Sequence, residues 1–184
     1  MGKVSPSNAP RRDQLEFEAR IEAHRGIVFK IANAYCAAGD ERDDLVQEIC
    51  LQLWRAYPGY DRERRFSTWM YRVALNTAIS FARATRLRRM RAVPLETSAA
   101  AALAGAAPAT CTDERLASLH LLLHRLDDLD RALVLLYLED RSYREIAEIL
   151  GISETNVGTR LNRCKEKLRQ GLAPDFRETE HGTR

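Results

Sequence analysis

The fold is decided by the stretch Ser142-Tyr-Arg-Glu-Ile-Ala-Glu-Ile-Leu-Gly-Ile-Ser-Glu-Thr-Asn-Val-Gly-Thr-Arg-Leu161. Its apolar residues recur at helical spacing up to Gly151, and glycine enters a left-handed turn without steric cost. Ser153 then supplies a good N-cap, and Glu154 places negative charge where a helix N-terminus favours it. The pattern predicts two short amphipathic helices joined by a tight turn, which is a helix-turn-helix.

The second of these helices has a buried side and a polar side. Val157, Leu161, Cys164 and Leu168 follow one another at steps of four, three and four, which makes one apolar stripe. Hydroxyl, amide and guanidinium groups on the other side suit base edges and phosphates. The candidate DNA contacts are Ser153, Thr155, Asn156, Thr159, Arg160 and Arg163. On this motif alone, a helical hairpin without DNA-binding activity is the alternative.

Charge is distributed unevenly along a chain of 184 residues whose formal net charge is only +3. Residues 62–91 hold nine arginines and one acid, whereas residues 40–48 hold five acids and one arginine. The 45% hydrophobic content is that of a globular protein with one ordinary domain or two small ones. One surface therefore suits phosphates, and another does not.

No metal, disulfide or cofactor site is indicated. The four cysteines (Cys36, Cys50, Cys111 and Cys164) are scattered without a Cys-x-x-Cys pair, and His120 and His124 lack a nearby third ligand. We interpret Cys164 as a core residue and not as a redox switch, because it lies on the apolar stripe. No apolar run approaches the ~18 residues of a membrane span, so we expect a cytoplasmic protein.

Three helices are predicted before the linker. The first begins at Asp13 and ends at the Gly39-Asp40 break, and the second begins at Asp43 and ends at Pro58. The second carries an apolar stripe of Leu45, Val46, Ile49, Cys50, Leu53, Trp54 and Tyr57. The third is capped by Ser67, extends to about Arg86, and has a polar face of Trp69, Arg72, Asn76, Ser80 and Arg83. A tryptophan on an arginine-lined face favours stacking on bases, and a core position is the alternative.

The predicted fold class is all-α: two small helical domains on a flexible linker, the second a helix-turn-helix of the winged-helix-like type. The chain divides into a disordered arm (1–12), an N-terminal domain (13–90), a linker rich in Ala, Pro, Ser, Thr and Gly (91–112), a C-terminal domain (113–172) and a tail (173–184).

Two more motifs precede the helix-turn-helix: Asp43-Asp-Leu-Val-Gln-Glu-Ile-Cys-Leu-Gln-Leu-Trp54 and Phe66-Ser-Thr-Trp-Met-Tyr-Arg-Val-Ala-Leu-Asn-Thr-Ala-Ile79. With these motifs the chain closely resembles the extracytoplasmic-function sigma factors of bacterial RNA polymerase, over about residues 13–90 and 113–170. The resemblance implies an initiation factor that binds core polymerase and reads the −35 promoter element with the helix-turn-helix. Its N-terminal domain (sigma region 2) would read and melt the −10 element. The C-terminal domain is then sigma region 4.

The resemblance also implies roles for single residues. The −10 element and the melted strand would be held by Tyr60, Arg64, Arg65, Phe66, Ser67, Trp69, Arg72, Asn76 and Arg83. The clamp helices of the polymerase β′ subunit would be contacted by Asp44, Gln47, Glu48 and Leu51, and the β flap by the C-terminal domain. Gly158 departs from the family, where many relatives carry Lys or another long polar residue, so no promoter sequence is carried over.

We therefore expect an initiation factor that is not an enzyme, takes no small-molecule substrate, does not insert into membranes, and is held inactive by an anti-sigma factor. A stand-alone transcriptional regulator with an N-terminal dimerisation or sensing domain is the alternative. An enzyme with an appended DNA-binding domain is a weaker one, because the sequence contains no catalytic triad pattern, glycine-rich phosphate loop or metal cluster.

Overall fold

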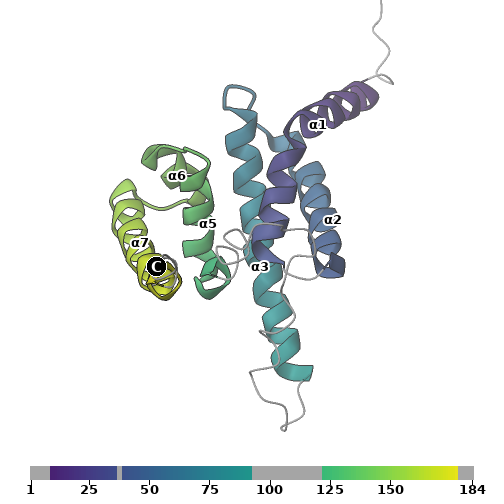
Figure 1. The fold of residues 1–184 in the computed structure, drawn as a ribbon. Coiled ribbons are helices and arrows are strands. Elements are labelled where there is room, and N and C mark those ends of the chain that lie inside the picture. The colour runs from purple at the N-terminus through teal and green to yellow at the C-terminus, as the bar shows by residue number, and fades with distance from the viewer. Residues whose placement is uncertain (1–8, 37–38, 93–121, 178–184) are drawn as a thin grey trace, which may run out of the picture.

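The computed structural model describes residues 9–36, 39–92 and 122–177, and most of these form helices (Figure 1). The helices are α1 (Ala9–Tyr35), α2 (Gly39–Ala56), the short 3-10 helix η2 (Tyr57–Gly59), α3 (Phe66–Ala92), α5 (Asp128–Leu138), α6 (Tyr143–Leu150) and α7 (Glu154–Arg177). No strand occurs within these ranges. The all-α prediction is confirmed, and among the described residues the helix-turn-helix has no β-wing.

The N-terminal domain is a bundle of α1, α2 and α3. Its core contains the side chains that the helical spacing marked as apolar, and the largest of those fully buried are Ile31, Leu45, Ile49, Leu53, Met70, Tyr71 and Leu75. Helix α2 ends at Ala56, directly before the turn that contains Pro58 and Gly59. Proline cannot donate the next helical hydrogen bond, so the chain leaves the bundle there and forms the loop to α3.

Helix ends differ from the sequence-based boundaries by several residues. Helix α1 begins at Ala9, so the last four residues of the predicted arm are helical, and Pro10 lies in the first turn, where a missing N–H costs nothing. Helix α2 begins at Gly39, and α7 continues to Arg177. Helix α3 extends from Phe66 to Ala92, so Ser67 lies inside its first turn and the prediction that Ser67 caps it was wrong. Residues 1–8, 37–38, 93–121 and 178–184 lie outside the described residues, so most of the predicted linker, Cys111 and His120 do as well.

Local capping explains the C-terminal domain. The Asp127 carboxylate accepts a hydrogen bond from the Asp130 backbone N–H at 2.8 Å and caps α5. Ser142 and Glu145 form a capping box at the start of α6. Gly151 ends α6 in the left-handed region with a φ of 68°, as the sequence predicted. The fully buried large side chains of the C-terminal domain are Leu133, Leu136, Ile146, Ile149 and Leu161.

The two domains lie side by side (Figure 1). Helices α5 and α6 pack beside α1 and α3, whereas α2 lies on the far side of the N-terminal bundle. The Arg131 guanidinium stacks over the Tyr35 ring at 5.0 Å, and the Arg141 guanidinium lies 5.1 Å from the centre of the Tyr71 ring. These contacts join side chains of the C-terminal domain to rings of the N-terminal domain.

Candidate nucleic-acid interface

The predicted recognition helix is α7, and its buried stripe is as predicted. Val157, Leu161 and Cys164 are at most 1% exposed. The Ser153 hydroxyl accepts a hydrogen bond from the Asn156 backbone N–H at 3.2 Å, which satisfies a free donor of the first turn. Ser153 is itself exposed, so it can cap the helix and still face a ligand.

The polar side of α7 faces solvent over its first two turns. Thr155, Asn156, Thr159 and Arg163 are all exposed. The Thr159 hydroxyl donates to the Thr155 carbonyl at 3.0 Å, which fixes its orientation on the helix surface. An exposed asparagine and arginine on one helix face are the two side chains best suited to bidentate contacts with adenine and guanine.

Arg160 points toward its own domain. Its Nε donates to the Asp130 carboxylate at 2.7 Å, and its Nη2 lies 3.2 Å from the Asp127 carboxylate. Asp130 is only 5% exposed, so this ion pair joins α7 to the buried start of α5. Burial raises the pKa of Asp127, but the hydrogen bond from the Asp130 N–H and the charge of Arg160 outweigh it and lower that pKa. A DNA contact by Arg160 stays a prediction. Its guanidinium is already paired with two acids.

The loop before α3 is built on a cluster of aromatic rings. Tyr60 stacks on Tyr57 with ring centres 6.1 Å apart, and lies 5.3 Å from Phe66 and 5.1 Å from Trp69. Phe66 is 6% exposed, and the Arg20 guanidinium covers its ring at 5.5 Å. Phe66 is therefore a buried support of the loop, and a direct DNA contact by this residue stays a prediction.

For Trp69 the sequence left two alternatives, a position that stacks on bases and a core position, and the structure has features of both. Its ring packs against the core and contacts Tyr57, Tyr60 and Phe66, yet the residue is only half-buried. Part of the side chain is therefore open to solvent, and stacking of Trp69 on a base stays a prediction. Ser67 next to it is also half-buried.

Trp54 lies where the sequence did not predict it. It was assigned to the buried stripe of α2, but it is 44% exposed and packs edge-on against Phe17 with ring centres 5.1 Å apart. It follows Leu53, which fills the core, and adjacent helical residues point in directions about 100° apart. The sequence signal was the spacing of Trp54, Tyr57 and Tyr60 at steps of three, directly around the Pro-Gly turn.

The rings of Trp54, Tyr57 and Tyr60 line a pocket of about 440 Å³. Its lining consists of Asp13, Trp54, Arg55, Tyr57, Pro58, Tyr60 and Arg62. Arg62 donates to the Glu16 carboxylate at 3.0 Å, which holds one wall against α1. The Tyr57 hydroxyl is buried and has no hydrogen-bond partner among the described residues. Burial raises the pKa of Tyr57, so the hydroxyl stays protonated and is a donor.

Helix α3 presents the two faces that the sequence predicted. Met70, Tyr71, Ala74, Leu75 and Ala78 are at most 1% exposed. On the other side, Arg72, Asn76, Ser80 and Arg83 are exposed and form a polar row that starts beside the aromatic loop. The loop arginines Arg64 and Arg65 are exposed as well, but both lie within ion-pair distance of acids on α6.

The outer face of α2 is acidic with an apolar centre. Asp44 and Gln47 are exposed, and Leu51 is 41% exposed. The Glu48 carboxylate accepts a hydrogen bond from Gln52 Nε2 at 2.7 Å and is half-buried. Because α2 lies away from the C-terminal helices, this face is open to a partner (Figure 1).

Two of the described cysteines, Cys36 and Cys164, are not activated. Burial raises the pKa of Cys36 and of Cys164 to about 11, so both thiols stay protonated near neutral pH. No group of three His, Cys, Asp or Glu side chains among the described residues is arranged to hold a metal ion. None of the described helices has the length and apolar character needed to cross a bilayer.

Comparison with known proteins gives the family. Residues 20–88 match the family Sigma-70 region 2, and residues 116–168 match Sigma-70, region 4. The chain belongs to the extracytoplasmic-function sigma factors. The two matches cover both domains in the expected order, and they favour a sigma factor over a stand-alone regulator.

Several relatives match over most of their length. The ECF RNA polymerase sigma factor SigW of Bacillus subtilis is 26% identical over 174 residues, which are 87% of this chain and 90% of SigW. The sigma factor RpoE of Bartonella quintana, solved with the anti-sigma factor NepR, shares the fold with a TM-score of 0.67 at 19% identity and covers 86% of this chain and 97% of RpoE. CnrH, solved with the cytosolic domain of CnrY, has a TM-score of 0.62 at 25% identity and covers 88% of this chain and 90% of CnrH.

Proposed function

We propose that this sigma factor reads its promoter with two separate surfaces and docks on core RNA polymerase with a third. The observation that carries the proposal is the aromatic pocket before α3, continued by the exposed row Arg72, Asn76, Ser80 and Arg83. Opening a duplex without ATP requires a site that captures an unpaired base and offsets the cost of unstacking, which is a few kcal/mol. A pocket with aromatic walls beside a polar and cationic helix face supplies such a site.

In the pocket, the ring of a −10 base would stack on Trp54 or Tyr60, and the Tyr57 hydroxyl would donate to an acceptor on its edge. Base stacking on an aromatic side chain contributes about 1–3 kcal/mol per base. The Tyr57 hydroxyl is closed to solvent in the free chain, so it reaches an acceptor on the base only if the rings around it move, and the hydrogen bond then removes the cost of a buried donor without a partner. Asn76 and the arginines of α3 would hold the backbone of the same strand.

The −35 element would be read as duplex by the first two turns of α7. The exposed Thr155, Asn156 and Thr159 lie at the helix N-terminus, which is the end that a recognition helix inserts into the major groove. Arg163 lies one turn further and would reach a phosphate. The C-terminal domain would also contact the polymerase β flap.

Polymerase docking would use the α2 face, where the exposed Leu51 lies one turn from Glu48 and two turns from Asp44. Interfaces concentrate binding energy in a few apolar anchors, and surrounding charges select the partner. Leu51 would be the anchor, and Asp44 with Glu48 would favour a basic surface such as the clamp helices.

An anti-sigma factor would keep this chain inactive in the cytoplasm. Two similar solved structures support this, because RpoE is held by the anti-sigma factor NepR and CnrH by the cytosolic domain of CnrY. Sigma factors are DNA-binding initiation factors, and we propose that this chain likewise catalyses no reaction of its own.

Run-off transcription with core polymerase from the source organism tests the function. We expect promoter-dependent transcripts from a library of its genomic DNA, and absence of any such transcript would overturn the proposal. Leu51→Ala should weaken polymerase binding, whereas Leu87→Ala, on α3 and similarly exposed at 48%, should not.

Binding of a fluorescent single-stranded −10 oligonucleotide to the assembled holoenzyme tests the pocket. Tyr57→Phe removes one hydroxyl and should weaken binding roughly 2- to 10-fold, the equivalent of one net hydrogen bond. Asn76→Ala should also weaken it, whereas Asn33→Ala, at an exposed position of α1, should leave it unchanged. Wild-type affinity in both Tyr57→Phe and Asn76→Ala would contradict the assignment.

A further inference from the structure

Gly158 leaves a notch in the surface of the predicted recognition helix. It lies inside α7, after the buried Val157 and before the exposed Thr159. A Cβ atom at this position would lie 3.6 Å from Tyr143 Cε2 and 4.0 Å from Tyr143 Cδ2. Apart from the adjacent residues and the α7 backbone, Tyr143 is the only described residue within 4 Å of that point. The floor of the notch is therefore helix backbone, and its wall is the edge of one aromatic ring.

Nothing in the free chain requires glycine at this position. Glycine inside a helix is unfavourable relative to alanine, because its backbone loses more freedom on folding. Gly158 has no positive φ, and a Cβ atom would meet only ordinary van der Waals distances. Close approach of the backbone to a ligand is another situation that favours glycine. The notch therefore indicates a ligand that reaches the helix backbone.

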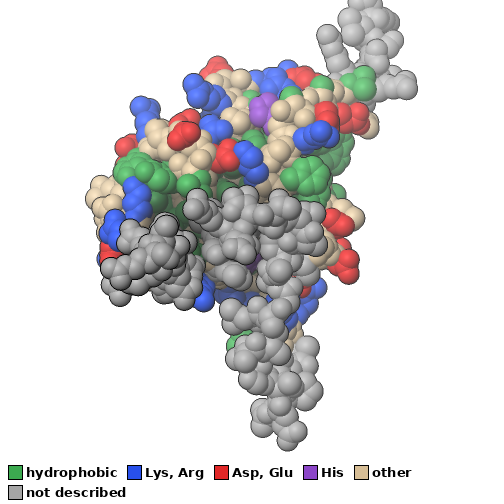
Figure 2. Space-filling model, in the orientation of Figure 1, with side chains coloured by type: hydrophobic (Ala, Val, Ile, Leu, Met, Phe, Trp, Pro, Cys, Tyr) green, Lys and Arg blue, Asp and Glu red, His purple; other side chains and the backbone are tan. Residues whose placement is uncertain are grey.

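The wall of the notch belongs to the first helix of the helix-turn-helix. Tyr143 is the first residue of α6, directly after the N-cap Ser142, and it is 39% exposed. Figure 2 shows hydrophobic side chains at the surface over α6 and the start of α7 (green, upper left). The helix-turn-helix thus offers apolar contact at its surface as well as hydrogen-bonding groups.

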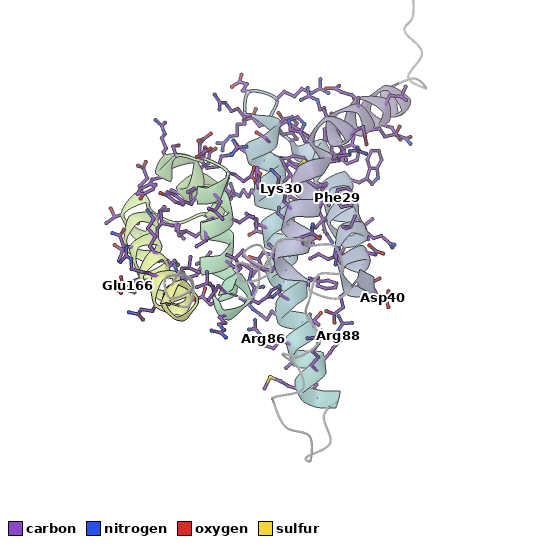
Figure 3. The ribbon with its side chains drawn as sticks, in the orientation of Figure 1. Phe29, Lys30, Asp40, Arg86, Arg88 and Glu166 are labelled. Atoms are coloured by element: carbon purple, nitrogen blue, oxygen red, sulfur yellow. The ribbon has the colours of Figure 1, made fainter. Side chains whose placement is uncertain are left out.

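The notch lies beside the candidate DNA contacts of α7. Thr155 precedes Gly158 by three residues and Asn162 follows it by four, so both are its neighbours on the helix surface, and both are exposed. Glu166 lies two turns beyond Thr159 on the same face. Figure 3 shows Glu166 on the outer side of the C-terminal domain, away from the N-terminal bundle. A duplex can therefore approach this face of α7 from solvent.

The chemistry of the notch matches one group in the major groove. Among the four bases, only thymine presents a C5 methyl group there, and proteins read this group by apolar contact. The space beside Tyr143 accommodates one carbon atom at ordinary contact distance. Cytosine carries only a hydrogen atom at C5 and would leave the space empty. A lysine, which many relatives carry at the position of Gly158, would fill it.

We infer that Gly158 and Tyr143 form a thymine-reading notch, in which the C5 methyl group of one thymine packs between the α7 backbone and the ring edge of Tyr143. Tyr143 is then a specificity-determining residue, although the sequence indicated only the second helix as the reader. The inference rests on the proposed reading of the −35 element by α7. It requires at least one A·T pair in that element.

Replacement of thymine by deoxyuridine tests the notch, because deoxyuridine pairs with adenine in the same way but lacks the C5 methyl group. The holoenzyme is bound to a promoter duplex from the run-off library, and each thymine of the −35 element is replaced in turn on either strand. We expect one replacement to weaken wild-type binding roughly 3- to 5-fold, as for burial of one methyl group. Equal affinity for all these duplexes would overturn the inference.

Variants of the notch assign the effect to its two residues. Gly158→Ala fills the notch with a Cβ atom, and Tyr143→Ala removes the wall, so the difference between the thymine and deoxyuridine duplexes should disappear in both. Tyr143→Phe keeps the ring and should retain the difference. Tyr137→Ala is the matched control and should retain it too, because Tyr137 is similarly exposed at 37% but has Lys165 as its neighbour, with Nζ 3.0 Å from its hydroxyl. An undiminished difference in Gly158→Ala, which removes no native side chain, would show that the methyl group is read elsewhere and would overturn the inference.

A duplex with a scrambled −35 element separates the failure of this inference from the failure of the proposed function. Wild-type holoenzyme should bind it more weakly than the promoter duplex. Equal binding would overturn the proposed reading of the −35 element and the notch with it. Sequence-dependent binding without any effect of deoxyuridine would overturn the notch alone.

Discussion

Replacing Gly158 by alanine should stabilise the C-terminal domain. Gly158 lies inside α7 and is half-buried. A Cβ atom at this position would lie 3.6 Å from Tyr143 Cε2 and 4.0 Å from Tyr143 Cδ2, which are ordinary van der Waals distances. The added methyl group therefore fits without displacing the ring, and no positive φ makes glycine necessary here.

The expected gain follows from helix propensity. Glycine in a helix interior costs up to about 1 kcal/mol relative to alanine, because its backbone loses more freedom on folding. The contact with Tyr143 adds little, since one methyl group meets one edge of a half-exposed ring. A gain of about 1 kcal/mol raises the melting temperature of a domain of this size by roughly 4–8 °C.

Two optical signals separate the domains. Both tryptophans of the chain, Trp54 and Trp69, lie in the N-terminal domain. Tryptophan fluorescence therefore follows that domain alone, while far-UV circular dichroism follows both. Gly158→Ala should shift the dichroism transition, and the matched control Gly26→Ala, in α1 with no atom near its added Cβ, should shift the fluorescence transition by a similar amount.

A lower melting temperature for Gly158→Ala, with the expected gain for Gly26→Ala, would refute the reasoning about the Tyr143 contact. A second measurement addresses why this chain has glycine here. If Gly158→Ala is more stable but its holoenzyme binds −35 duplex at least about tenfold more weakly, the backbone approaches DNA closely at this position. Unchanged duplex binding would exclude that role.

Three further predictions follow from single contacts. Arg160→Gln should destabilise the C-terminal domain by roughly 2 kcal/mol in urea unfolding, less than the ~3–5 kcal/mol of a fully buried pair because Arg160 is 27% exposed; no loss would show that Asp130 does not need its partner. Cys36 and Cys164 should react with iodoacetamide at pH 8 roughly 100-fold more slowly than an exposed thiol until denaturant is added, because both are buried with a pKa near 11; rapid labelling of the native chain would contradict their burial. Hydrogen bonds from Ser142 lower the pKa of Glu145, so the stabilisation from this carboxylate is present above its unfolded pKa of about 4.3 and is lost as pH falls through the folded pKa. Glu145→Gln should therefore lose stability less steeply than wild type below about pH 5 in an acid titration. The same loss of stability in both proteins would count against the capping box as its cause.

Much of this protein is determined by local sequence. Helical spacing identified the core stripes, such as Val157 and Leu161 on α7, because a buried helix face repeats every three to four residues. Gly151 and Ser153 fixed the turn of the helix-turn-helix, because a left-handed residue and an N-cap are requirements of the backbone itself. The order of three motifs was enough to predict the family.

Only the tertiary structure decided which functional side chains are free. Arg160 was predicted to face DNA, but its partner Asp130 lies thirty residues earlier, and helical spacing says nothing about such a neighbour. Trp54 had the spacing of a core residue, yet the bundle places it at the rim of a pocket. The pairing of Arg64 and Arg65 with α6 depends on how two domains pack. Contacts between segments far apart in the chain follow from packing and charge complementarity over whole surfaces, and residue order alone does not encode them in any short pattern.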